Sequence, residues 1–156
     1  MKRILCTLIL ITIVTFSNYS QNENIDLVQS VIGIKKKEAF KSFMILNNSN
    51  NDIFWELYDE YELKRKELGK ERIELLENYV NKYDNMNEES TAMALKQMIT
   101  MTSDLNKLIA SYSKKIKKSA GAKPAGQFFQ LETYITSVVR VSIMENIPLI
   151  GEFETK

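Results

Sequence analysis

The strongest constraint on the fold is a seam of large side chains that recur alternately four and three residues apart. This spacing places all of them on one face of an α-helix that packs lengthwise against a partner helix. It predicts a helix over residues 52–83, about 48 Å long at 1.5 Å per residue. Gly69 weakens such a helix by about 1 kcal/mol relative to alanine without ending it. The seam consists of Phe54, Tyr58, Tyr61, Arg65, Leu68, Arg72, Leu75 and Tyr79.

A second long helix is predicted after the polar turn at residues 84–87. Asn87 is a suitable N-cap, and Glu88 and Glu89 follow it at the positive helix end. Lysines occupy the last turns, where cations oppose the negative end. The same spacing recurs in this helix, in a seam formed by Ala94, Met98, Met101, Leu105, Leu108 and Tyr112 and widened by Leu95, Ile99, Ile109 and Ile116.

Two shorter helices complete the prediction. The first covers residues 27–45 and ends at an asparagine-rich turn, after which Asn51 or Asp52 caps the next helix. The last begins near Pro124 and ends before Pro148, and a strand over residues 137–143 remains an alternative because valine and isoleucine are mediocre helix formers. The expected fold is all-α: an elongated antiparallel helical hairpin with two additional shorter helices.

The first twenty residues have the pattern of a signal peptide. Lys2 and Arg3 precede an apolar run over residues 4–16, and small residues follow at cleavage positions. The run is shorter than the ~20 residues that span a bilayer. We therefore expect cleavage near Ser20, export to the periplasm, and one domain over residues 21–156 without stable membrane insertion. Cys6 lies inside the run, so the mature chain would have no disulfide.

Composition excludes several function classes. The chain has no histidine, which removes the usual general base and the commonest metal ligand. The formal net charge of +1 gives no general attraction to nucleic acid. No glycine-rich phosphate loop occurs, and no nucleophile–base pair is evident. We expect a protein that is not an enzyme and needs no cofactor.

Metal binding has two candidate sets of ligands, each with a simpler explanation. Thioethers suit monovalent copper, so Met93, Met98 and Met101 could form a site. Methionine also fills helix seams, which explains Met98 and Met101 better. Acidic side chains could bind a hard cation, but they alternate with basic ones as on a solvated helix face. The acidic residues concerned are Glu56, Glu60 and Glu67.

Charged residues on apolar stripes suggest a structural ion pair. Arg65 and Arg72 lie on the seam of the first long helix, where an unpaired charge is costly. Glu132 lies in the apolar stretch of the last helix, and arginine pairs well with carboxylates. We therefore predict that Arg72 meets Glu132, with Arg65 as the next partner, and that the pair fixes helix registry.

A surface for clients or partners is also predicted. Lysines at the end of the second long helix could attract acidic partners, although complementing the helix end explains them too. Phe129, Tyr134 and Val141 lie off the main stripe of the last helix, which indicates a homodimer interface or a binding face. The predicted surface comprises Lys114, Lys115, Lys117, Lys118, Phe129 and Tyr134.

The order of leader, short helix, polar turn, long hairpin and final helix resembles the Spy/CpxP-like periplasmic proteins, the LTxxQ family. The segments FWELYDEYE at residues 54–62 and PAGQFFQLE at residues 124–132 are similar to those of exported members of that group. LNNS at residues 46–49 stands where a first Leu-Thr-x-x-Gln falls, and only the leucine matches. Residues 124–127 correspond to a second Leu-Thr-x-x-Gln, of which they keep the glutamine, Gln127. The departures affect the motif that names the family.

The resemblance implies a curved helical dimer whose concave face holds unfolded clients or a membrane-bound sensor. The expected function is that of a chaperone-like or stress-response binding protein that holds partly unfolded clients. The alternative is a regulatory module that binds the periplasmic part of an anti-sigma protein or a sensor kinase. A metal sensor is a third option, which the missing histidines weaken.

Overall fold

The computed structural model describes residues 33–150, and within that range every regular element is helical. A helix at residues 33–43 is followed by α3 (Asn51–Lys82), the short 3-10 helix η1 (Tyr83–Asn85), α4 (Glu88–Ala120) and α5 (Ala122–Met144). The predicted all-α fold with a long hairpin and two shorter helices is confirmed. A strand at residues 137–143 is wrong, because these residues belong to α5.

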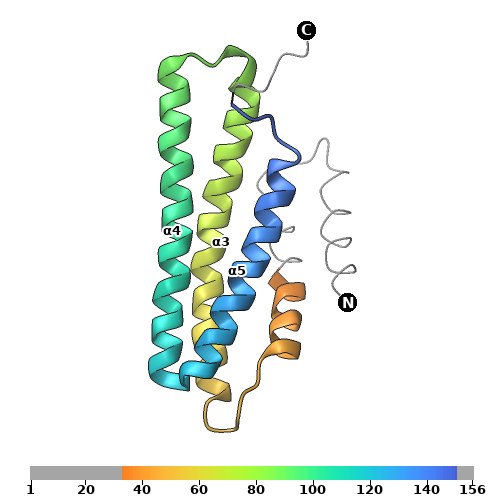
Figure 1. The fold of residues 1–156 in the computed structure, drawn as a ribbon, viewed down its shortest axis with the longest axis vertical. Helices are drawn as coiled ribbons and strands as arrows, with labels where there is room; N and C mark the ends of the chain where they lie inside the picture. Colours follow the sequence, from red (N-terminus) through yellow and green to blue (C-terminus); the bar gives the residue numbers. More distant parts are fainter. Residues whose placement is uncertain (1–32, 151–156) are drawn as a thin grey trace.

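The helices form an elongated bundle (Figure 1). α3 and α4 run antiparallel as a hairpin, and α5 returns from the far end of α4 in the same direction as α3. α4 packs against both α3 and α5, and the 33–43 helix lies beside α5 at the end where α5 begins. Residues 27–32 of the predicted first helix and the predicted signal peptide lie outside the described residues. No described helix is long and apolar enough to span a membrane.

The core is richest in aromatic rings near the α4–α5 turn. Phe40 packs on Tyr58 with ring centroids 4.8 Å apart, and Tyr61 meets Phe128 and Tyr112 edge to face at 5.1 and 5.6 Å. Each of the four helices contributes at least one of these rings, so a single cluster joins all of them. Such ring pairs are worth about 0.5–1.5 kcal/mol each beyond the area they bury.

The predicted seams match the sides of α3 and α4 that face the other helices. All eight seam residues of α3 are buried or partly buried, and so are the six of α4. Leu95 and Ile99 do not widen the α4 seam as predicted, because 52% and 60% of their surfaces are exposed. Ile109 and Ile116 lie on the same side of α4 lower down, where α5 covers that side, and both are buried.

The two turns have distinct chemistry. The predicted cap at Asn87 is confirmed: its side chain accepts from the Ser90 amide at 2.9 Å, and the Ser90 hydroxyl accepts from the Asn87 amide at 2.8 Å. Gly121 joins α4 to α5 at a φ of 103°, which L side chains rarely adopt. The Asn50 side-chain amide donates to the Ala120 carbonyl at 3.0 Å and so closes the end of α4.

The predicted cap of α3 is one residue out of place. The helix begins at Asn51, so its N-cap is Asn50 and neither Asn51 nor Asp52. Asn50 makes no side-chain capping bond, because its amide group is used by Ala120 and its carbonyl oxygen accepts from the Asn47 amide. The asparagine-rich turn is therefore held by its own side chains and by the α4–α5 corner.

Candidate functional site

Glu132 lies at the centre of a buried ionic network that joins three helices. Its carboxylate oxygens are 2.8 and 2.7 Å from Nζ of Lys36 on the 33–43 helix. Oε1 also accepts a 2.5 Å hydrogen bond from the Tyr61 hydroxyl on α3. Lys36 donates in addition to Glu62 at 2.6 Å. Lys36 is 5% exposed, Glu62 8% and Glu132 1%, so these charges compensate one another away from water.

Arg65 is connected to this network through Glu62. Its Nε donates to both carboxylate oxygens of Glu62, at 3.1 and 3.0 Å, and it makes no ion pair with Glu132. The buried Tyr58 hydroxyl has no hydrogen-bond partner among residues 33–150. Burial, followed by the nearby carboxylates, raises the pKa of Tyr58 and of Tyr61 above the ordinary range, so both remain neutral phenols.

The predicted pairing of Arg72 with Glu132 is wrong. α5 and α3 run in the same direction, and the bonds of Tyr61 place Glu132 at the level of Tyr61 and Glu62. Arg72 is ten residues beyond Glu62, or about 15 Å farther along α3. Its neighbour is Arg140 of α5, whose like charge adds to burial in lowering the pKa of Arg72.

Lys36, and not an arginine, makes the ion pair with Glu132. Lys36 stands in the run Lys35–Lys37, which has the appearance of a solvated charged segment. A signal was nevertheless present: Lys36 is four residues before Phe40, so both lie on one helix face. A lysine on the apolar face of a short helix indicates a buried carboxylate partner.

The predicted basic cluster is exposed, and one of its lysines is held in place. Lys114, Lys115, Lys117 and Lys118 are all exposed on α4. Nζ of Lys115 lies 4.3 Å from the centroid of the Tyr112 ring and 3.7 Å from the Glu60 carboxylate. Surface contacts of this kind contribute about 0–1 kcal/mol each. The cluster is therefore a solvated helix end whose side chains are held by few contacts.

The two apolar residues of α5 that were predicted to belong to a client or partner surface are exposed. Phe129 and Tyr134 are 47% and 44% exposed, although Phe128 beside them is fully buried. The Gln127 side chain accepts from the Ile45 amide at 3.2 Å and donates to the Phe43 carbonyl at 3.0 Å, which fixes the end of the 33–43 helix against α5. We call the exposed set Phe43, Ile45, Phe129 and Tyr134 the apolar side chains around α5.

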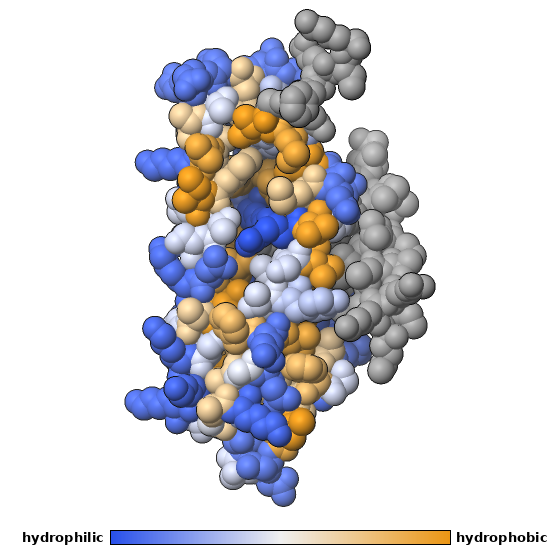
Figure 2. All heavy atoms as spheres, in the orientation of Figure 1, coloured by the Kyte–Doolittle hydropathy of each residue, from blue (hydrophilic) through white to orange (hydrophobic). Residues whose placement is uncertain are grey.

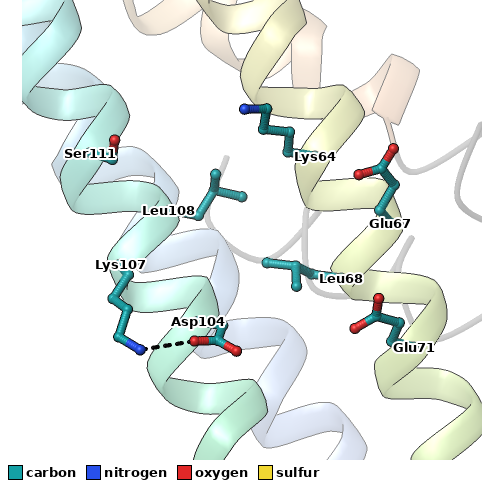
Figure 3. A pocket seen from close by; sticks show the side chains of 8 residues that line it. All are labelled: Lys64, Glu67, Leu68, Glu71, Asp104, Lys107, Leu108 and Ser111. Carbon is teal, nitrogen blue, oxygen red and sulfur yellow. Dashed lines mark hydrogen bonds and ion pairs between the residues drawn. The ribbon is translucent and has the colours of Figure 1, made fainter.

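An open groove of about 420 Å³ lies between α3 and α4 (Figure 3). Leu68 and Leu108 lie among charged side chains of both signs, and Lys107 pairs with Asp104 at 3.0 Å. The remaining lining residues are Lys64, Glu67, Glu71 and Ser111. Because lysines neutralise most of the acidic charge, the groove is typical of a solvated helix surface.

The structure does not gather the candidate acidic metal ligands into one site. In the range 33–150, no group of three or more histidine, cysteine, aspartate or glutamate residues could hold a metal ion. Met98 and Met101 are partly buried on the inner side of α4, and Met93 is 53% exposed. Glu60, one of the predicted acidic ligands, accepts from the Tyr112 hydroxyl at 3.3 Å.

Comparisons with protein-family models, with curated proteins and with solved structures found no match to this chain. The resemblance to the Spy/CpxP-like proteins stays a prediction that no relative tests.

Proposed function

We propose that this chain is an exported, non-enzymatic helical binding protein that holds partly unfolded protein chains on an amphipathic surface. The observation that carries the proposal is the exposed apolar surface of the bundle, in particular the apolar side chains around α5. Phe43 and Ile45 are 43% and 62% exposed, and Phe129 and Tyr134 are similarly open. Large apolar side chains left exposed around one helix indicate a contact region for another molecule.

Charge beside this surface supports a protein client. The exposed lysines at the end of α4 lie next to the α4–α5 turn, and α5 begins directly after that turn. Unfolded chains present apolar and acidic side chains together, so neighbouring apolar and basic groups suit them. Weak, non-directional contacts of this kind allow one surface to accept many sequences. A homodimer would extend the surface, and light scattering coupled to gel filtration gives the mass that tests it.

An aggregation-suppression assay tests the function. We expect the purified protein to delay light scattering by several chemically unrelated aggregating proteins. The double variant Phe129→Ser/Tyr134→Ser should lose most of this effect. Leu63→Ser is the matched control, because Leu63 is 66% exposed on a different helix, α3. Its activity should be unchanged.

The assay also separates the two functions considered for this fold. A protein inert toward every unrelated client would contradict the chaperone-type function and favour one dedicated regulatory partner. Equal loss in the control variant would mean that general stickiness, and not the surface around α5, is responsible.

A further inference from the structure

Two arginines lie near each other in the half of the bundle distant from the α4–α5 turn, and no described acidic side chain pairs with either. Arg72 of α3 and Arg140 of α5 are both partly buried, and neither makes an ion pair or side-chain hydrogen bond with residues 33–150. The hydrogen bond from Tyr61 to Glu132 sets the register of α3 and α5, so Arg72, eleven residues after Tyr61, and Arg140, eight residues after Glu132, lie within about 5 Å of the same level. The charge of Arg140 acts on Arg72 accordingly. Arg65 provides the contrast, since Glu62 compensates it. We call Arg72 and Arg140 the arginine pair.

The register of the helices places α4 beside this pair. Tyr61 of α3 contacts Tyr112 of α4. Arg72 is eleven residues after Tyr61, and Met101 is eleven residues before Tyr112. Because α3 and α4 are antiparallel, Arg72 and Met101 lie at the same level of the bundle. Arg72 of α3, Arg140 of α5 and Met101 of α4 therefore border one region of the bundle.

Apolar side chains surround the pair. Met98 and Met101 are partly buried on α4, and methionine is flexible enough to fit ligands of varied shape. Figure 2 shows the result as a recess between α4 and α5, with strongly hydrophilic atoms inside it and apolar surface around it. The exposed apolar side chains of this half are Leu95 and Ile99 on α4, Val141 and Met144 on α5, and Leu149 and Ile150 beyond it.

The segment after α5 bounds this region at the far end. The Tyr79 hydroxyl donates to the Pro148 carbonyl at 2.8 Å, and the Tyr83 hydroxyl donates to the Leu149 carbonyl at 2.7 Å. Tyr79 is seven residues beyond Arg72, which is about 10 Å along α3. The region therefore offers a positive site at one end and about 10 Å of apolar length beyond it.

The chemistry of the pair selects its ligand. Arginine stays charged under all ordinary conditions, so two partly desolvated guanidinium groups that lie near each other repel unless an anion joins them. Their planar forks match the two oxygens of a carboxylate, and such charge-assisted bonds are among the strongest that side chains make. The apolar surroundings would exclude a small hydrated anion but would cover a hydrocarbon chain.

We propose that the arginine pair binds the carboxylate of a medium-chain fatty acid, whose hydrocarbon chain lies on the apolar surface between α4, α5 and the segment 145–150. The site is separate from the apolar side chains around α5, so it does not depend on the proposed client binding.

Titration calorimetry with dodecanoate below its micelle concentration tests the proposal. We expect one dodecanoate per chain. Dodecanol, which lacks the carboxylate, and acetate, which lacks the hydrocarbon chain, should show no measurable binding. Arg72→Met and Arg140→Met should each weaken binding about tenfold or more, as expected when a charge-assisted hydrogen bond is lost. Arg72→Lys should recover only part of the affinity, because lysine lacks the fork.

Lys107→Met is the matched control, since it removes an exposed cation from the opposite groove of α4. Equal binding of dodecanol and dodecanoate, or unchanged affinity in both arginine variants, would overturn the proposal. Equal binding of acetate would show a simple anion site without a hydrocarbon subsite and would also overturn it. Circular dichroism of each variant confirms folding, and the ligand-free Arg72→Met protein should be at least as stable as the parent.

Discussion

Lys36→Met tests whether the buried network is as strongly coupled as its geometry indicates. The change removes the ammonium group that contacts Glu62 and Glu132 but keeps an unbranched side chain in the same space. Glu62 retains Arg65, whereas Glu132, 1% exposed, retains only the Tyr61 hydroxyl. Stranding one member of a buried ion pair costs about 3–5 kcal/mol. We expect the free energy of unfolding to fall by that amount.

A neighbouring lysine gives the control. Lys37 pairs with Asp59 on the surface, and the side chains of this pair are 36% and 56% exposed. Lys37→Met should therefore change the free energy of unfolding by about 1 kcal/mol at most. Urea unfolding followed by far-ultraviolet circular dichroism at neutral pH measures both variants under the same conditions.

A double-mutant cycle then isolates the coupling. Glu132→Leu in the Lys36→Met background removes the stranded carboxylate, so the double variant should be more stable than the sum of the single changes implies, by about 1–3 kcal/mol. Additive effects, or equal losses from Lys36→Met and Lys37→Met, would refute the reasoning. Either result would mean that Glu132 finds compensation that does not involve Lys36.

Three further predictions follow from particular contacts. Phe128→Ala should cost about 3–5 kcal/mol in urea unfolding because Phe128 is fully buried, whereas Phe129→Ala should cost less than about 1 kcal/mol. Asn87→Ala removes the capping box and should cost about 1 kcal/mol by the same measurement. The raised pKa values of Tyr58 and Tyr61 mean that their stabilising effect is complete below about pH 10, the ordinary tyrosine pKa, and is lost as pH rises above it. Unfolding at alkaline pH should coincide with the last rise in tyrosinate absorbance, and ionisation of all tyrosines in a still folded protein would contradict this.

The sequence was sufficient for the helices because their signals are local. The four–three spacing from Phe54 to Tyr79 predicted the buried face of α3, and the polar turn before Glu88 predicted the capped start of α4. Both depend on residues a few positions apart, where helix geometry alone decides which side chains meet.

The site was predicted less well because it depends on register between distant helices. Glu132 was correctly identified as a buried acid, but its partner depends on how far α5 extends along α3 and on where the 33–43 helix packs. A shift of ten residues separates Arg72 from the position at which it would meet Glu132. The sequence pattern contains no measure of that shift.

The bond between Lys36 and Glu132 also bears on the order in which the chain folds. It joins residues 96 positions apart, whereas the α3–α4 and α4–α5 contacts join neighbouring helices across short turns. Contacts between near neighbours close small loops and form quickly, and distant ones form later because they lose more chain entropy. The three-helix unit of α3, α4 and α5 should therefore assemble first, and the 33–43 helix should dock onto it last. The same helix should open first in the native state, so that its amides exchange with solvent hydrogen before those of the hairpin.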